Sequence, residues 1–118
     1  MSEHCVVYIS TGSEAEARSL ATALVKERLA ACVNRVGPVT STYIWEDKLQ
    51  EDTEYLLVAK TRRGLIETLA ARVRELHSYS LPEVIALPIV DGLPAYLDWI
   101  SQATVSSDPS SVSSIQEP

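Results

Sequence analysis

The amino-acid sequence predicts an α+β domain whose elements follow the order β-α-β-β-α-β, with one more short helix at the end. Two observations lead to this class. Four segments have the apolar, β-branched composition of strands, and two long segments repeat apolar residues at helical spacing. With 118 residues the chain has the length of one domain, because domains usually hold about 100–200 residues.

The first strand and the first helix are joined by a helix-start signal. Residues 5–10 form a continuous apolar run, which predicts a buried strand. Ser13 and Glu16 form a capping box, in which the Ser side chain accepts a backbone N–H and the Glu reaches back to another. A helix is therefore expected over residues 14–30. Its predicted buried stripe consists of Ala17, Leu20, Ala21 and Leu24.

The middle of the chain predicts a long antiparallel hairpin. Residues 32–36 have strand character, and the Gly-Pro pair at 37–38 bends or bulges the strand before it continues over residues 39–45. Residues 46–48 are expected to form the turn, and residues 54–60 the returning strand.

The second half predicts a helix, a strand and a short helix. The first of these helices is expected over residues 63–77, and its apolar positions are Leu65, Leu69, Val73 and Leu76. The strand, residues 83–90, contains Pro88, which lacks a donor for the ladder and therefore predicts an edge or a bulge. Pro94 suits the first turn of the last helix. That helix carries Tyr96, Leu97, Trp99 and Ile100.

This order is that of the ferredoxin-like fold with an antiparallel sheet. The two main helices would cover one face of the sheet, while apolar residues on both sides of the strands leave the other face open. An uncovered apolar face predicts an oligomer. The predicted domain covers residues 1–103. Residues 104–118, with six Ser and two Pro, are expected to form a disordered tail.

Composition and charge exclude several classes of function. The chain has 16 acidic and 10 basic residues and a net charge of −6. This balance argues against nucleic-acid binding, which needs a basic surface, and against binding to anionic membranes. With two Cys and two His, a Cys₄ or Cys₂His₂ zinc site within one subunit would use almost every such residue, at spacings that do not match.

The chain shows no targeting or membrane signal. Its first residues carry no basic segment and no long apolar run, so no signal peptide is expected. No stretch approaches the roughly 18 apolar residues of a membrane-spanning helix. Cys5 and Cys32 are therefore expected as reduced thiols in a cytoplasmic protein. His4, near a frayed end, is expected in solvent.

Residues with catalytic potential are few, and no enzymatic activity is expected. Cys32 and His77 are the one couple that would serve a nucleophilic enzyme, but Cys32 lies between Ala31 and Val33, as a buried structural thiol would. His77 ends the second predicted helix, where the helix dipole favours a cation. Its role is therefore capping or packing, or contact with a metal or ligand.

Five separated motifs give a more specific indication. Leu-Ala-Ala-Cys-Val-Asn at 29–34 joins the first helix to the second strand, and Ser-x-Tyr-x-Trp-Glu-x-Lys follows at 41–48. Glu54 and Lys60-Thr61 come next, then Leu-His-x-Tyr-x-x-Pro-Glu at 76–83 and Tyr-Leu-x-Trp at 96–99. In order and spacing these motifs resemble the CutA family of divalent-cation tolerance proteins over about residues 5–101.

The resemblance implies a ferredoxin-like subunit that assembles into a tight homotrimer with the architecture of the PII signalling proteins. It also implies a link to tolerance of copper and other divalent metals, no catalytic reaction and no obligatory cofactor. Cu(II) or another divalent cation would be the ligand, bound weakly at or near clefts between subunits. An obligate trimer is also expected to resist heat. The alternative is a PII-like regulatory or scaffold trimer that binds a small molecule or a protein, with no direct role for metals.

The matching positions that would line a cleft are Cys32, Tyr43, Trp45, Glu54, Lys60, Tyr79 and Glu83. His77 is the best metal candidate, because a neutral imidazole suits Cu(II) and Zn(II). Glu54 and Glu83 would supply carboxylate oxygens, unless Lys60 pairs with one of them. Tyr43 and Trp45 equally suit packing in a core or interface.

Four positions depart from the family pattern. Asp47 replaces a Gly of the hairpin turn, and Ser78 replaces the Pro that usually follows the His. Some members carry a Cys where this chain has Ser10 and a second His where it has Leu76. The loss of these two ligands argues against a soft, high-affinity copper site.

Overall fold

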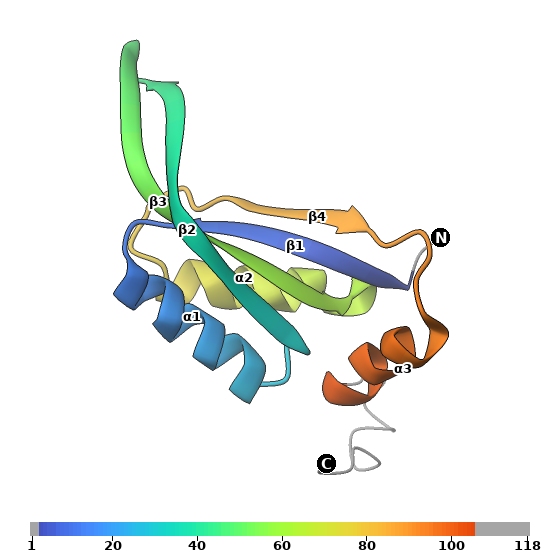
Figure 1. The fold of residues 1–118 in the computed structure, drawn as a ribbon. Helices are drawn as coiled ribbons and strands as arrows, with labels where there is room; N and C mark the ends of the chain where they lie inside the picture. The colour runs from blue at the N-terminus through green and yellow to red at the C-terminus, as the bar shows by residue number, and fades with distance from the viewer. Residues whose placement is uncertain (1–2, 106–118) are drawn as a thin grey trace.

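The computed structural model describes residues 3–105 and shows the predicted order of elements (Figure 1). In chain order these are β1 (His4–Thr11), α1 (Glu14–Lys26), β2 (Cys32–Trp45), β3 (Lys48–Arg62), α2 (Ile66–Leu76), β4 (Val84–Pro88) and α3 (Pro94–Ala103). The four strands form one antiparallel sheet in the order β2-β3-β1-β4. This is the ferredoxin-like topology, and β4, which contains Pro88, is an edge strand as expected.

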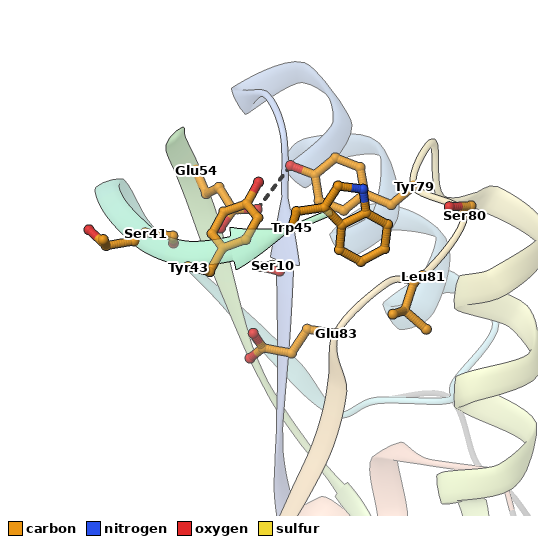
Figure 2. Close-up of a pocket in the computed structure, with 10 residues that line it drawn as sticks. Ser10, Ser41, Tyr43, Trp45, Glu54, Tyr79, Ser80, Leu81 and Glu83 are labelled. Carbon is orange, nitrogen blue, oxygen red and sulfur yellow. Dashed lines mark hydrogen bonds between the residues drawn. The ribbon is translucent and has the colours of Figure 1, made fainter. Parts of the chain in front are cut away.

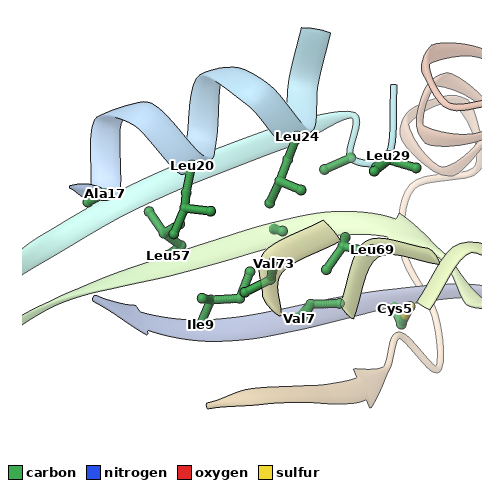
Figure 3. Packing of buried hydrophobic residues seen from close by; sticks show 12 residues of the cluster. Cys5, Val7, Ile9, Ala17, Leu20, Leu24, Leu29, Leu57, Leu69 and Val73 are labelled. Carbon is green, nitrogen blue, oxygen red and sulfur yellow. The ribbon is translucent and has the colours of Figure 1, made fainter. Parts of the chain in front are cut away.

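The core lies between the sheet and helices α1 and α2 (Figures 1 and 3). Alternate residues of β1 point toward the helices, so Cys5, Val7 and Ile9 are buried. Helix α1 contributes Ala17, Leu20 and Leu24, as its spacing predicted, and the fourth predicted residue, Ala21, is only partly buried. Burial of the Val, Leu and Ile side chains in this core stabilises the fold by about 1.5–3 kcal/mol each.

The first helix is shorter than predicted and ends at Lys26. Arg28 takes a left-handed conformation with φ of 58°. Its N–H donates to the carbonyl of Val25 at 3.0 Å, and the N–H of Leu29 donates to that of Leu24 at 2.9 Å. This pair of bonds is a Schellman motif, which closes a helix without needing Gly in the sequence. Leu29 then turns back into the core.

The second helix ends one residue before the prediction, and its buried stripe differs at one position. Leu69 and Val73 are buried, and Leu65 is buried in the 3₁₀ turn (Arg63–Leu65) that precedes α2. Leu76 is 40% exposed. Leu65, Leu69 and Val73 are spaced four residues apart. The next position at this spacing is His77 rather than Leu76, and His77 is the buried residue.

The hairpin of β2 and β3 is longer than the sequence indicated and extends beyond the rest of the sheet (Figure 1). The predicted bulge is present between Val36 and Val39. At Gly37 an added Cβ would lie 2.7 Å from the Tyr55 ring, so only Gly fits there. The returning strand begins at Lys48, well before residue 54. Its first residues are mostly exposed, so no burial pattern marked them as a strand.

Both ends of the described chain are better fixed than expected. His4 belongs to β1, and its Nε2 lies 2.8 Å from Ser101 Oγ, so its placement in solvent was wrong. Thr104, which was assigned to the tail, is buried, and its hydroxyl accepts a bond from Arg62 Nε at 2.8 Å. The N–H of Val105 donates to the carbonyl of Arg28 at 2.8 Å. The rest of the predicted tail, residues 106–118, lies outside the described residues.

The second face of the sheet is open, as predicted. The register places Val36 of β2 and Ile85 and Leu87 of β4 on this face. The three side chains remain 43–51% exposed. Among residues 3–105, no helix has the length and apolar character needed to cross a membrane.

The hairpin turn gives a stability prediction. Glu46 and Asp47 have φ of 52° and 63°, a left-handed pair that two-residue hairpins need and that Gly adopts without steric cost. Asp47→Gly should therefore raise the free energy of unfolding by about 0.5–1 kcal/mol, measured by chemical denaturation at fixed protein concentration. Glu51→Gly, within regular β3, should lower it. A loss of stability in Asp47→Gly would contradict this account of the turn.

An acidic and aromatic pocket at the end of the sheet

A pocket of about 540 Å³ lies where the end of β1, the β2–β3 hairpin and the loop after α2 meet (Figure 2). It contains five of the predicted site residues: Tyr43, Trp45, Glu54, Tyr79 and Glu83. The other lining residues are Ser10, Ser41, Thr42, Ser80 and Leu81. Sequence reasoning did not find this second group, because Ser, Thr and Leu carry no chemical signal that separates a pocket wall from an ordinary surface.

Tyr79 is held against β1 and bonded to β3. An added Cβ at Gly12 would lie 3.0 Å from the Tyr79 hydroxyl oxygen, so the absence of a side chain there lets the ring approach. The hydroxyl donates to Glu54 Oε2 at 2.9 Å (Figure 2). Burial, together with the bond to the Glu54 carboxylate, raises the pKa of Tyr79 above its ordinary value. Tyr79 therefore remains a neutral donor that fixes Glu54.

His77 is buried beside the pocket and supports Tyr79. The backbone N–H of Tyr79 donates to Nδ1 of His77 at 3.0 Å, so Nδ1 carries no proton. Nε2 lies 2.7 Å from the carbonyl oxygen of Ser10 and must carry the proton that this bond requires. The His77 and Tyr79 rings are also in contact, with centroids 4.7 Å apart. Both nitrogens of His77 are engaged, so a metal ion there would have to break one of these bonds.

Glu16 ties the loop after α2 to the start of α1. Its Oε2 accepts the N–H of Ser78 at 2.8 Å, and its Oε1 accepts the N–H of Gly12 at 3.2 Å. Burial opposes ionisation, but these hydrogen bonds hold the pKa of Glu16 below its ordinary value. The N–H of Glu16 donates to Ser13 Oγ at 3.1 Å, as the capping box predicted. The carboxylate, however, bonds to Gly12 rather than to Ser13, and its bond to Ser78 had no signal in the sequence.

The pocket carries uncompensated negative charge. Glu54 is only 8% exposed, whereas Glu83 is an exposed residue of the pocket wall. Partial desolvation by the pocket wall, followed by the nearby Glu54 carboxylate, raises the pKa of Glu83 above its ordinary value. No Lys, Arg or His belongs to the lining, and within residues 3–105 neither carboxylate has an ion-pair partner. The pocket therefore favours a positively charged occupant.

Cys32 and Lys60 are not part of the pocket in one chain. They face each other across β2 and β3, several residues from Glu54, and Lys60 Nζ donates to Asn34 Oδ1. The pairing of Lys60 with Glu54 or Glu83 that the sequence left open is absent from the described structure. Cys32 is half-buried rather than fully buried, and it is a free thiol like Cys5. The His77 nitrogens bond elsewhere, so the hypothetical Cys32–His77 couple does not form.

The described residues contain no group of three or more His, Cys, Asp or Glu side chains that could hold a metal ion within one chain. Glu54 and Glu83 provide two carboxylates. A complete coordination shell would therefore need water or groups from another chain.

The fold and the pocket define a small protein of the ferredoxin-like α+β class with an acidic and aromatic pocket. Comparisons with known proteins identify its family. Residues 5–103 match the model of the CutA1 divalent ion tolerance protein family, so the chain belongs to this family. It is 50% identical over 99 residues to the divalent-cation tolerance protein CutA of Thermus thermophilus, in a match that covers 84% of this chain and 96% of that protein.

Two further relatives extend the comparison. The chain is 46% identical over 99 residues to a chloroplastic CutA protein of Arabidopsis thaliana, across 84% of this chain and 54% of that protein. It thus spans about half the length of that plant relative. A solved structure of the divalent cation tolerance protein from Thermus thermophilus superposes with a TM-score of 0.84 at 48% identity, covering 86% of this chain and 98% of that one.

The Glu16 bonds give a pH prediction. The folded-state pKa of Glu16 lies below its unfolded value, so its contribution to stability is complete above about pH 5 and is lost as the pH falls through the carboxyl range. Near neutral pH, Glu16→Gln should lower the free energy of unfolding by about 1–2 kcal/mol. This difference from wild type should vanish in acid, as measured by denaturation at a series of pH values.

Glu14→Gln is the matched control for this experiment. Glu14 also lies in the first turn of α1, but its carboxylate pairs with Arg18 at 3.9 Å in an exposed position, and such pairs contribute little. A difference between Glu16→Gln and wild type that persisted unchanged into acid would contradict the role of the carboxylate.

Proposed function

We propose that this chain forms a homotrimeric divalent-cation tolerance protein that binds cations weakly at the acidic pocket, at or near clefts between subunits. The observation that carries the proposal is the pair of carboxylates, Glu54 and Glu83, that line a pocket without a basic side chain. Membership of the CutA1 family supports the tolerance role. In this proposal the protein binds and releases cations and catalyses no reaction.

The homotrimer rests on the open face of the sheet. Val36, Ile85 and Leu87 expose apolar surface there, and no element of residues 3–105 covers it. A second and third copy would bury this surface, and large buried interfaces add to resistance against heat. Assembly would also bring carboxylates from several chains together, which would complete the shell that one chain lacks.

The metal site that we propose is centred on Glu54 and Glu83 rather than on His77. Carboxylate oxygens bind many divalent cations, whereas the nitrogens of His77 are both hydrogen-bonded. Two oxygen ligands per chain with added water give weak binding, for Cu(II) or for another divalent cation. The two free thiols support a reducing, cytoplasmic location for the trimer.

A specific observation favours a second function, in which the pocket binds a small molecule as part of a PII-like regulatory or scaffold trimer. A volume of about 540 Å³ lies within the range of small-molecule sites. Three aromatic side chains, Tyr43, Trp45 and Tyr79, line it, and a bare metal ion would not need them.

Light scattering after size exclusion tests the trimer. The wild type should have three times the mass of the 12.9-kDa chain. Ile85→Glu should dissociate it, because a charge would enter an apolar interface. Val25→Glu changes a similarly exposed side chain on α1, on the helix-covered side, and should leave the trimer intact. A wild-type monomer would overturn this part of the proposal.

Calorimetric titration with Zn²⁺ tests the metal site. Glu83→Gln should weaken binding by about tenfold, because it removes one of two charged ligands. Glu51→Gln, an exposed change on the same hairpin as Glu54, should have no effect. The imidazole ¹⁵N signals of His77 should keep the pattern of a ring protonated at Nε2 throughout. Zn²⁺-induced shifts of those signals would instead place the metal at His77, and a wild type without binding would refute direct metal binding.

A further inference from the structure

The walls of the pocket combine two features that one ligand class satisfies together. Tyr43, Trp45 and Tyr79 contribute aromatic side chains, and Glu54 and Glu83 contribute carboxylates (Figure 2). Aromatic faces attract cations through the ring quadrupole, and carboxylates attract them directly. Ligands with apolar groups around a positive charge gain from both.

The Glu54 side chain shows most clearly that the pocket wall suits a cation. It is more than nine-tenths buried. Its Oε2 accepts the bond from Tyr79. Within residues 3–105 its Oε1 accepts no hydrogen bond, and because no fully buried side-chain oxygen there lacks a partner, Oε1 is accessible from outside the protein. A largely buried carboxylate with one neutral donor and no counter-ion keeps its charge incompletely compensated. A cationic ligand in the pocket would compensate that charge.

The tyrosine hydroxyls of the pocket are not available as hydrogen-bond donors to an anionic ligand. The hydroxyl of Tyr79 donates to Glu54, and the hydroxyl of Tyr43 donates to Asp52 Oδ2. Both phenol donors are thus directed at carboxylates of the protein. An anion would meet the charges of Glu54 and Glu83, and the lining side chains would offer it only Ser and Thr hydroxyls and the indole N–H of Trp45.

From this arrangement we infer that the pocket is a binding site for an organic ammonium ion, with its charge near Glu54 and Glu83 and its carbon atoms against the rings of Tyr43, Trp45 and Tyr79. The inference rests on the second proposed function, a small-molecule pocket, and names the class of its ligand. It differs from a bare metal site because it assigns a role to the aromatic walls as well as to the carboxylates.

Three probes with the same four-carbon chain test the inference: n-butylammonium, butan-1-ol and butyrate. The readout is the indole N–H signal of Trp45 in NMR spectra of the full-length protein at constant ionic strength. The chain has two Trp, and Trp99, in α3, serves as the internal reference because it does not line the pocket. Assignment follows from Trp45→Phe.

We expect n-butylammonium to shift the Trp45 signal and leave that of Trp99 in place. Butan-1-ol should bind at least about tenfold more weakly, and butyrate should not bind. Glu83→Gln should weaken n-butylammonium binding about fivefold or more, whereas Glu51→Gln, which keeps the pocket wall, should not. If the NMR signals of both variants match those of the wild type outside the pocket, the variants are folded.

Equal binding of n-butylammonium and butan-1-ol would overturn the charge preference and leave a small-molecule pocket standing. Stronger binding of butyrate than of n-butylammonium would also overturn the charge preference, and would indicate a pocket for anions. If none of the three probes moves the Trp45 signal, both the inference and the small-molecule function fail, while the metal titration remains a separate test.

Discussion

The pocket depends on one carboxylate that is not part of it. Glu16 accepts N–H groups from Gly12 and Ser78, and so joins the end of β1 to the loop that follows α2. That loop carries His77 and Tyr79, and His77 in turn bonds back to Ser10. Because these bonds close a ring between two segments more than 60 residues apart in sequence, Glu16 helps to fix the position of Tyr79, which bonds to Glu54 of β3.

The same network explains why the conspicuous His is a supporting residue. A His in a loop rich in polar residues is an obvious metal candidate, and here the family resemblance reinforced that hypothesis. The structure instead uses its acceptor nitrogen for Tyr79 and its donor nitrogen for Ser10. Glu54 and Glu83, by contrast, have no basic partner among the described residues. Our proposals therefore assign ligand binding to these acids and to the aromatic rings beside them.

The sequence predicted the fold well, because burial patterns and turn residues are local signals. The order of strands and helices, the bulge after Val36 and the edge position of β4 all followed from them. The errors lie where backbone bonds or contacts between residues distant in sequence determine the structure. Backbone hydrogen bonds at Arg28 end α1, and no residue type in the sequence indicates them. Thr104 belongs to the folded domain because Arg62 donates a hydrogen bond to its hydroxyl. The motifs correctly indicated five residues of the pocket wall. They also indicated Cys32 and Lys60, which do not line the pocket in one chain.

The bond between Val105 and Arg28 has a practical consequence. It fixes the chain just beyond the C-terminal end of α1, whereas the pocket lies by Gly12, near the other end of that 13-residue helix, about 20 Å away at 1.5 Å per residue. The helix also belongs to the covered side of the sheet (Figure 1). A reporter or an immobilisation tag fused after residue 105 would therefore start from a point remote from both the pocket and the apolar face.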